Sequence, residues 1–248
     1  MSDRVQIDVE VLVLGYAMSR LDRGFLDRLG FASWRAAFGR VEEQFGVKAS
    51  SVKNVRDEFD LLHPHRVGHK KALPPSRVSV VEDCAGLSDA ELVEVVQGIL
   101  EGEFEEARRV EGRLRRRPKA SAAAQRLRTG LFAEKYFLAH AKRICGIAAE
   151  RLIDVRYEAA GFDFGSRDQA RLAIEVKGLQ AKRGPILFTD HEWRTARARG
   201  ADYWVVVIGN IAATPRSLVI EDPVARIEVA KRVERRTARS WVGEVAVA

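Results

Sequence analysis

Three charged residues lie close together where the sequence otherwise predicts buried β-structure. Glu175 and Lys177 stand two residues apart in the run IEVKG, so alternation along a strand places both on one face. Asp163 opens the same segment, at the start of an expected hairpin that would bring it beside Glu175 at one sheet edge. Two carboxylates suit a hard divalent cation such as Mg²⁺, and the Lys177 ammonium would orient water and offset charge on a phosphate. The three side chains therefore predict metal-assisted phosphodiester hydrolysis.

The elements that would hold these side chains form a mixed α/β unit from Thr129 onward. Apolar positions at helical spacing fill residues 129–144, and strand-like runs follow at 152–160, 171–178, 184–189 and 202–210. Between the last two runs, Thr189 and Glu192 form a capping-box pattern and Gly200 ends the helix. The order helix, three strands, helix, strand predicts a mixed sheet. For the Glu-x-Lys spacing alone, a solvated ion pair on an exposed sheet stays open.

The segment resembles the PD-(D/E)xK nuclease superfamily, which has the restriction-endonuclease-like fold. The resemblance rests on Asp163, an interval of eleven residues and then Glu175-x-Lys177, with Phe162 where the family name has proline. It is closer still to the nuclease-like domain found at the C-terminus of the plant protein NO VEIN and in bacterial defence proteins. There a helix is followed by Gly-[Tyr/Phe]-Asp, Ile-Glu-Val-Lys and a segment like LFTDHEW…DYWVVVIGN. The likeness spans about residues 129–212.

The resemblance implies a metal-dependent, DNA-cleaving core. By that likeness Asp163 and Glu175 are Mg²⁺ ligands, Lys177 is the catalytic lysine, and the Val176 carbonyl is a further ligand. Glu134, in the preceding helix, matches a helix carboxylate that some members use as an additional ligand, and a plain surface carboxylate is an equal alternative. Gln180 lies just beyond the strand, where it would contact metal-bound water or DNA. His191 is either a general base or, in the first turn of a helix, a capping or substrate-facing residue.

The first eighty residues predict a helical DNA-recognition unit. Ser33 suits a helix cap, Gly46 suits its end, and a second helix is expected to begin near Ser50 or Ser51. Two helices joined by such a turn form a helix-turn-helix pattern, similar to the recognition modules of restriction-type enzymes. That likeness implies that outward residues of the second helix lie near a DNA groove, while a helical packing or dimerisation unit is the alternative. The inward positions are expected to be Val52, Val55 and Phe59, and the outward ones Ser51, Lys53, Asn54 and Arg56.

Basic residues follow in two further stretches. The proline-punctuated run 61–77 contains Lys70 and Lys71, which suit a loop that faces solvent or phosphate. Its three histidines lack partners at metal-ligand spacing. Residues 87–117 predict one long helix that starts with a capping box at Ser88 and Glu91 and has a basic end. The cluster around Arg116, continuing to Arg126 and Arg128, suits either a solvated helix end or a grip on phosphates.

Composition sets the outer limits of these predictions. The chain has 248 residues, a formal net charge of +7 and a sequence pI of about 9.6, which favours a polyanionic partner. Cys84 and Cys145 show neither CxxC pairing nor nearby histidines, as expected of a reducing cytoplasm rather than a structural zinc site. The sequence shows no secretory leader and no apolar run of bilayer-spanning length, so we expect a cytoplasmic protein without membrane contact.

Together these features predict a Mg²⁺-dependent, restriction-type endonuclease acting on double-stranded DNA. The expected fold is α/β, with a mixed-sheet, restriction-endonuclease-like catalytic domain (129–248) preceded by an all-α, helix-turn-helix-like domain (1–80) and a long, basic helical connector (81–128). Cutting both strands requires two active sites, so a homodimer is expected on DNA, and a separate DNA methyltransferase is a possible partner. Two alternatives stay open: a catalytically silent DNA-binding or regulatory protein, and a nuclease acting on RNA or on branched or damaged DNA.

Overall fold

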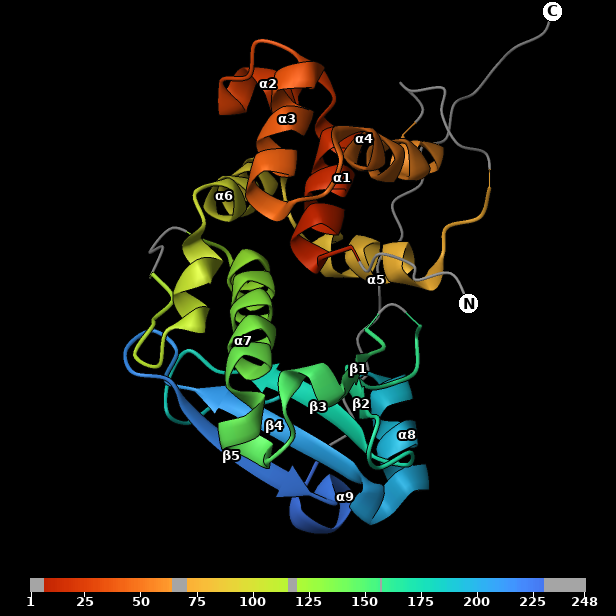
Figure 1. Ribbon diagram of the computed structural model, residues 1–248, viewed down its shortest axis with the longest axis vertical. Coiled ribbons are helices and arrows are strands. Elements are labelled where there is room, and N and C mark those ends of the chain that lie inside the picture. The colour runs from red at the N-terminus through yellow and green to blue at the C-terminus, as the bar shows by residue number, and fades with distance from the viewer. Residues whose placement is uncertain (1–6, 64–70, 116–119, 157, 230–248) are drawn as a thin grey trace, which may run out of the picture.

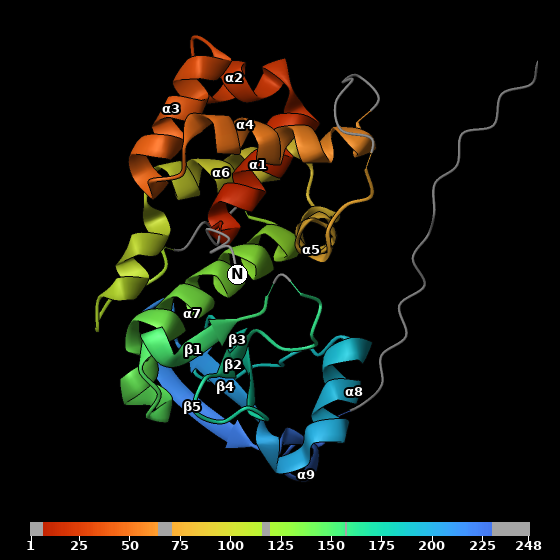
Figure 2. The ribbon, with the colours of Figure 1, turned by 45° about the vertical axis from the view of Figure 1, so that its right-hand side comes forward.

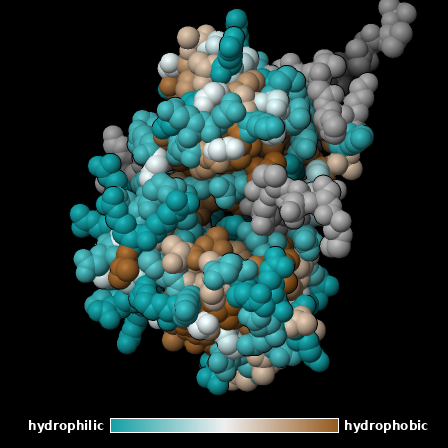
Figure 3. Space-filling model, viewed as in Figure 1, coloured by the Kyte–Doolittle hydropathy of each residue, from teal (hydrophilic) through white to brown (hydrophobic). Residues whose placement is uncertain are grey.

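A computed structural model describes residues 7–63, 71–115, 120–156 and 158–229 of the chain. A helical half lies above a half built on a β-sheet, and the long helix α7 (Ala122–Cys145) crosses the sheet between them (Figures 1 and 2). None of the helices in the described ranges has the length and apolar character needed to cross a membrane. The face seen in Figure 3 is mostly hydrophilic, with brown apolar patches in the lower, sheet-containing half.

The helical half begins with a helix that is buried almost along its whole length. Residues 10–19 of α1 are buried, and its neighbour α4 comes so close that a Cβ added at Gly15 would lie 2.5 Å from Val55 Cγ1. The segments α2, α4, η1, α5 and α6 all contact α1. In chain order the segments of this half are α1 (Val9–Leu21), α2 (Arg23–Leu29), α3 (Trp34–Phe45), α4 (Ala49–Glu58), η1 (Phe59–Leu62), α5 (Pro75–Cys84), α6 (Asp89–Leu100) and η2 (Glu103–Arg108).

The two helices of the expected helix-turn-helix are present as α3 and α4. The Ser33 hydroxyl accepts a hydrogen bond from the Ala36 N–H at 3.2 Å, and Gly46 ends α3 with a left-handed φ of 67°. The second helix begins at Ala49, one residue earlier than the earliest expected start. Val52, Val55 and Phe59 are buried, as the sequence pattern predicted.

The prediction of one long helix over residues 87–117 is wrong. The Ser88–Glu91 capping box starts α6 as expected, but the helix ends at Leu100, and Gly102 adopts a left-handed φ of 73°. The turn at Gly102 allows the chain to fold back and bury Phe104 and Ala107 in the core. The next helix, α7, is capped by Ser121 and starts well before Thr129, where the sequence pattern placed it.

The sheet half contains a mixed, five-stranded sheet in the order β1-β2-β3-β4-β5. The pair β3–β4 is parallel, and the other neighbouring pairs are antiparallel. A mixed α/β architecture was predicted and is present. The order helix, three strands, helix, strand also occurs from α7 to β4, but with β2 as one of the three strands in place of the expected run 184–189. After α7 the elements are η3 (Ala149–Arg151), β1 (Leu152–Asp154), β2 (Phe164–Ser166), β3 (Ala173–Gly178), α8 (Asp190–Arg199), η4 (Gly200–Asp202), β4 (Tyr203–Gly209), β5 (Arg216–Glu221) and α9 (Pro223–Arg226).

Two strand assignments differ from the prediction. Residues 184–189, expected as a strand, form an irregular segment that leads from the sheet to α8. Gly184 and Pro185 open that segment, and proline lacks the N–H that a ladder requires. The outer partner of β4 is instead β5, which the sequence pattern had not indicated. The capping box of Thr189 and Glu192 and the helix end at Gly200 are both confirmed.

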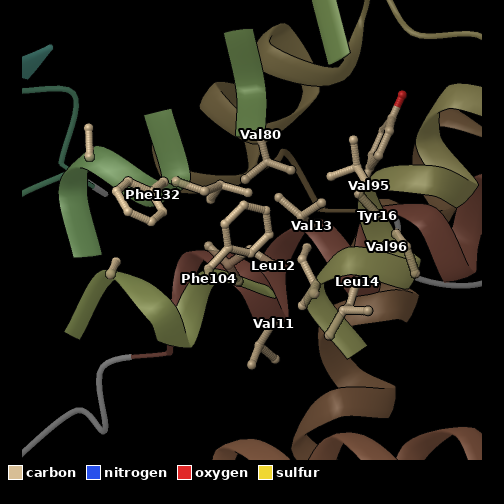
Figure 4. Packing of buried hydrophobic residues seen from close by; sticks show 14 of the residues in the cluster. Val11, Leu12, Val13, Leu14, Tyr16, Val80, Val95, Val96, Phe104 and Phe132 are labelled. Atoms are coloured by element: carbon tan, nitrogen blue, oxygen red, sulfur yellow. The ribbon is translucent and has the colours of Figure 1, made fainter. Parts of the chain in front are cut away.

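One hydrophobic core runs through both halves. Side chains from α1, α5, α6, η2 and α7 meet in Figure 4, where Leu12, Val80, Phe104 and Phe132 lie close together. The same cluster continues through α7 to one face of the sheet. At that crossing a Cβ added at Gly178 would lie 2.7 Å from the Thr129 carbonyl oxygen, so the helix packs directly on the strand.

Candidate active site

The central strand β3 and the start of β2 bring two carboxylates together. The antiparallel register pairs Phe164 with Ile174, and continuing it by one step places Asp163 opposite Glu175. The expected pairing of these two residues is therefore present. Its expected place at a sheet edge is wrong, because β3 is the third of five strands. A central strand is fixed on both sides, which holds Glu175 in a defined position.

The Asp163 carboxylate takes the place of a strand partner for β3. Its Oδ2 atom accepts a hydrogen bond of 2.7 Å from the Val176 N–H, at the point where the β2–β3 ladder has ended. The N–H and C=O of one residue leave a strand toward the same neighbour. The Val176 carbonyl therefore points toward Asp163, as expected of a backbone ligand for the same cation.

Alternation along β3 places apolar core residues on one face of the sheet and the charged residues on the other. Leu172, Ile174 and Val176 belong to the core beneath α7. Glu175 and Lys177 occupy the opposite face. They share that face with Tyr203 and its neighbours on β4, and α8 covers it. Glu175 is only 4% exposed, whereas Asp163 keeps a moderate accessible surface.

The Lys177 ammonium lies between two carboxylates. Its Nζ atom is 2.6 Å from Glu175 Oε1 and 2.6 Å from Glu192 Oε2. The same Glu192 Oε2 atom accepts a hydrogen bond of 3.1 Å from the Thr189 N–H in the α8 capping box. The Phe188 ring covers the ammonium at 5.4 Å from its centroid, a distance at which cation–π attraction acts. Glu192 therefore ties the start of α8 to the lysine.

The loop just before Asp163 is held in place by contacts with α8 and β4. Gly161 has a left-handed φ of 78°, and a Cβ at this position would collide with the Thr195 side chain of α8. The Tyr203 hydroxyl donates a hydrogen bond of 3.0 Å to the Gly161 carbonyl, and His191 Nε2 lies 2.8 Å from the Ala159 carbonyl. His191 thus has a structural contact with this loop, beside its predicted capping or catalytic role.

The charges of the site disfavour two neighbouring carboxylate ions. Burial, and then the negative charge of Glu134, raise the pKa of Asp163 from its ordinary 3.8 to about 8. Burial and the charge of Asp163 raise the pKa of Glu175 well above its usual value. Burial lowers the pKa of Lys177, but the charges of Glu175 and Glu192 outweigh that effect and raise it above its usual value. The lysine is therefore a fixed cation, and the carboxylates require further positive charge to ionise together.

The donor set fits a hard divalent cation in an open site. Among the described residues, Asp163 Oδ1 and Glu175 Oε2 accept no hydrogen bond. Within the same part of the chain, no three Asp, Glu, His or Cys side chains converge into a closed metal site. Mg²⁺ characteristically uses one or two carboxylates and completes its coordination with water and substrate phosphate. Asp163, Glu175 and the Val176 carbonyl provide such a partial set.

Glu134, the further ligand implied by the family resemblance, is held by an arginine. It forms an ion pair of 2.5 Å with Arg156, which also pairs with Asp154 and lies over the Phe164 ring. Two adjoining cavities flank this network between α7 and the start of α1, and Asp8, Leu138 and Arg156 line both of them. The residues that line these two cavities do not include the carboxylate pair. Glu134 acts on Asp163 through its charge, and its carboxylate is engaged by Arg156.

The expected DNA-binding residues are dispersed over the molecule. Lys53 and Asn54 are exposed on α4, although Lys53 also pairs with Asp57 at 2.6 Å, and Ser51 is partly exposed. The expectation that Arg56 points outward is wrong. The residue is only 6% exposed because its guanidinium lies over the Trp34 ring and pairs with Asp57.

The other residues expected to contact DNA also differ in whether their side chains are available. Lys71 is exposed, whereas Lys70 and Arg116 lie outside the described residues. Gln180 donates a hydrogen bond of 2.7 Å to the Thr129 hydroxyl on α7, so its amide is engaged away from the carboxylate face. Arg128, assigned to a phosphate-gripping cluster as one alternative, is fully buried and paired with Glu103.

Two residues of the site were not predicted from the sequence. Glu192 was identified only as a helix-capping residue, and the capping box gave no sign that its carboxylate also reaches Lys177. Asp83 on α5 lies close enough to experience the charges of Glu134, Glu192 and Lys177. Loss of hydration, and then the negative charge of Glu134, raise the pKa of Asp83 to about 7. No local pattern links α5 to the sheet, because only tertiary packing brings them together.

Comparison with known proteins agrees with the location of this site. Residues 133–220 match the family model described as Protein NO VEIN, C-terminal, a family associated with nuclease-like domains. The match runs from within α7 into β5 and so includes Asp163, Glu175, Lys177 and Glu192. No curated protein and no solved structure matches the chain. The predicted likeness to this family is confirmed, and membership of the wider PD-(D/E)xK superfamily stays a prediction.

Proposed function

We propose that this protein is a metal-dependent nuclease of restriction-endonuclease-like fold that hydrolyses phosphodiester bonds of double-stranded DNA. The observation that carries the proposal is the pair Asp163–Glu175: the carboxylate just before β2 lies opposite the carboxylate on the central strand β3, both have raised pKa values, and a fixed lysine lies beside Glu175. The matched family and the basic composition support the same conclusion.

Each residue of the site has a distinct task in the proposed reaction. Asp163, Glu175 and the Val176 carbonyl hold Mg²⁺, with the Val176 N–H keeping the Asp163 carboxylate in place. When bound, Mg²⁺ acts as a Lewis acid on the phosphate and lowers the pKa of coordinated water. Lys177 places its ammonium beside the reacting phosphate and offsets the negative charge that develops there. Glu192 keeps that ammonium on the reactive face of the sheet.

A cleavage assay on plasmid DNA tests the proposal. The parent protein is incubated with supercoiled plasmid in Mg²⁺ or in EDTA, and nicked and linear products are measured on a gel. We expect cleavage only in Mg²⁺, and a rate loss of about 100-fold or more for Glu175→Gln and for Lys177→Ala. Arg171→Gln is the matched control, because Arg171 is exposed on the same half and pairs with Asp202 instead. Unchanged rates in both site variants would refute the assignment.

The same assay separates the alternatives. Salt-dependent DNA binding without cleavage in any divalent metal would identify a catalytically silent DNA-binding protein. Cleavage restricted to RNA, or to branched or damaged DNA, would identify a nuclease of another pathway. Cutting both strands at one position requires two sites, so we also propose a homodimer on DNA, which sedimentation of the protein with a short duplex would detect.

A further inference from the structure

Basic side chains gather beyond the C-terminal ends of the parallel strands β3 and β4. They come from two loops and from the first residue of β5, which directly follows a third loop, and all of them are exposed. Among the described residues none of them forms an ion pair, whereas many other surface arginines, such as Arg151 and Arg171, have a carboxylate partner. We call this set the basic end surface, and it consists of Arg113, Arg115, Lys182, Arg183 and Arg216.

Backbone hydrogen bonds bring the three loops together. Leu114 N–H donates to the Ile211 carbonyl at 2.8 Å, and Asn210 N–H donates to the Ala181 carbonyl at 2.9 Å. A Cβ added at Gly209 would lie 4.0 Å from both the Lys182 and the Arg216 carbonyl oxygens. Figure 1 shows these loops side by side at the left of the sheet, and the corresponding edge in Figure 3 is mostly hydrophilic.

The loop with two of the arginines is anchored from inside. Leu114, between Arg113 and Arg115, is 1% exposed, so the loop is fixed to the core. The buried Arg128 guanidinium donates a hydrogen bond of 2.8 Å to the Arg115 carbonyl. The surface is therefore preorganised, which lowers the entropic cost of holding a ligand. Glu111 is the nearby exposed acid along this loop, and it leaves the set strongly positive.

A single loop joins the basic end surface to the candidate active site. The segment from residue 179 to residue 189 carries Lys182 and Arg183, and then Phe188, which covers the Lys177 ammonium. Lys182 lies five positions after Lys177, and that interval spans at most about 17 Å of extended chain. That length corresponds to about five base pairs of duplex DNA at 3.4 Å each.

We propose that the basic end surface binds backbone phosphates of duplex DNA on one flank of the scissile bond, within about five base pairs of it. This inference rests on the proposed nuclease function and adds the path of the substrate over the protein. Phosphate contacts position a duplex without reading its sequence. The surface therefore sets where the backbone lies, and it leaves base recognition to other parts of the chain.

Salt dependence of binding tests the proposal without any need for cleavage. The probe is a fluorescein-labelled duplex of about 30 base pairs, and its anisotropy is followed in EDTA at several salt concentrations. The logarithm of the binding constant falls as the logarithm of the salt concentration rises. Loss of three phosphate contacts makes this fall shallower by about 2.7 in slope. Between 50 and 200 mM salt the parent then loses about 40-fold more affinity than the variant. The variant combines Lys182→Gln, Arg183→Gln and Arg216→Gln.

A control with the same change of net charge isolates the surface. It replaces three exposed arginines of the same half by glutamine, each of which already has a carboxylate partner: Arg151, Arg171 and Arg194. We expect the control to keep the parent slope. Equal slopes for the basic-end variant and the parent would overturn the inference while plasmid cleavage still supports a nuclease. Equal reductions in both variants would also overturn it, since they would report net charge alone. A parent without salt-dependent binding would overturn the inference and the proposed DNA substrate together.

Discussion

Replacement of Glu192 by glutamine tests whether this residue positions Lys177, the proposed catalytic lysine, or only caps a helix. Glutamine serves a capping box as well as glutamate, so the variant keeps the start of α8 and removes only the negative charge. Lys177 then retains Glu175 at 2.6 Å as its carboxylate partner. The perturbation is therefore electrostatic and local.

The expected loss of stability depends on how far the ion pair between Lys177 and Glu192 is shielded from solvent. The side chains of Lys177 and Glu192 are 17% and 18% exposed, so solvent screens their attraction only in part. Breaking a fully buried pair costs roughly 3–5 kcal/mol because one charge is left alone, and Glu175 prevents that here. We expect a loss of about 1–2 kcal/mol, which lowers the Tm of a chain of this size by about 2–8 °C.

Two assays separate the roles of Glu192. Thermal unfolding in EDTA reports the lost ion pair, and plasmid cleavage in Mg²⁺ reports the position of the Lys177 ammonium. A displacement of about 1 Å in a catalytic group can cost about 100-fold in rate, so we expect cleavage to fall by 10- to 100-fold. Thr189→Ala is the control, because it removes the capping hydroxyl at a cost of about 1 kcal/mol and leaves the ion pair in place.

A double-mutant cycle decides between the explanations. Glu192→Gln and Lys177→Met, alone and together, give the coupling energy between the two side chains, for which we expect about 1–2 kcal/mol. If Glu192→Gln unfolds and cleaves like the parent protein, Glu192 is a capping residue alone and the positioning role is wrong. A loss of stability with unchanged cleavage would likewise remove it from the catalytic arrangement.

Three further predictions follow from the same geometry. The raised pKa of Asp163, from 3.8 to about 8, favours the protonated acid in the folded state, so the metal-free protein loses stability as pH rises through that range. Mg²⁺ competes with those protons, and its stabilising shift in Tm should therefore grow from pH 5 to pH 8; a shrinking shift would contradict the metal site. Gly161→Ala should displace the loop before Asp163 against Thr195, with reduced Mg²⁺ affinity by calorimetry and intact helical circular dichroism. Gly178→Val should cost about 1–3 kcal/mol in urea unfolding, because α7 packs directly on that position.

The grouping of charged residues at the candidate site was predictable because its signal is local. Glu175 and Lys177 stand two positions apart on a strand, and Asp163 lies within one hairpin of them, so spacing and alternation suffice. Helix ends were predictable for the same reason, as at Ser33 and Gly46. The break of the expected long helix at Gly102 was missed, because it depends on the burial of Phe104 in a core assembled from distant segments.

Buried arginines were the hardest residues to interpret from the sequence. Arg56 has the spacing of an outward helix position, yet the Trp34 and Phe38 rings of α3 attract its guanidinium and keep it buried. Arg128 similarly belongs to a basic run but pairs with Glu103 inside the core. The pattern of charge in a sequence gives the number of cations. Which of them face solvent depends on aromatic and acidic partners that the fold supplies.

The balance of charge distinguishes the candidate site from the other buried ion pairs of this protein. Lys135 joins α7 to Glu10 and Glu105, and Glu105 has a second cation in Arg108, so that network is neutral. At the site, three carboxylates from the start of β2, from β3 and from α8 surround one ammonium, which leaves two negative charges in excess when all are ionised.

Such an excess is costly within a protein, and burial together with the neighbouring negative charges raises the pKa values of Asp163 and Glu175. A structural network would be more stable with a second fixed cation in place of one carboxylate. A bound divalent cation neutralises the excess only while it is present, and it leaves coordination positions open for water and phosphate. The uncompensated charge around β3 therefore supports the proposed metal-dependent reaction rather than a contribution to the stability of the fold.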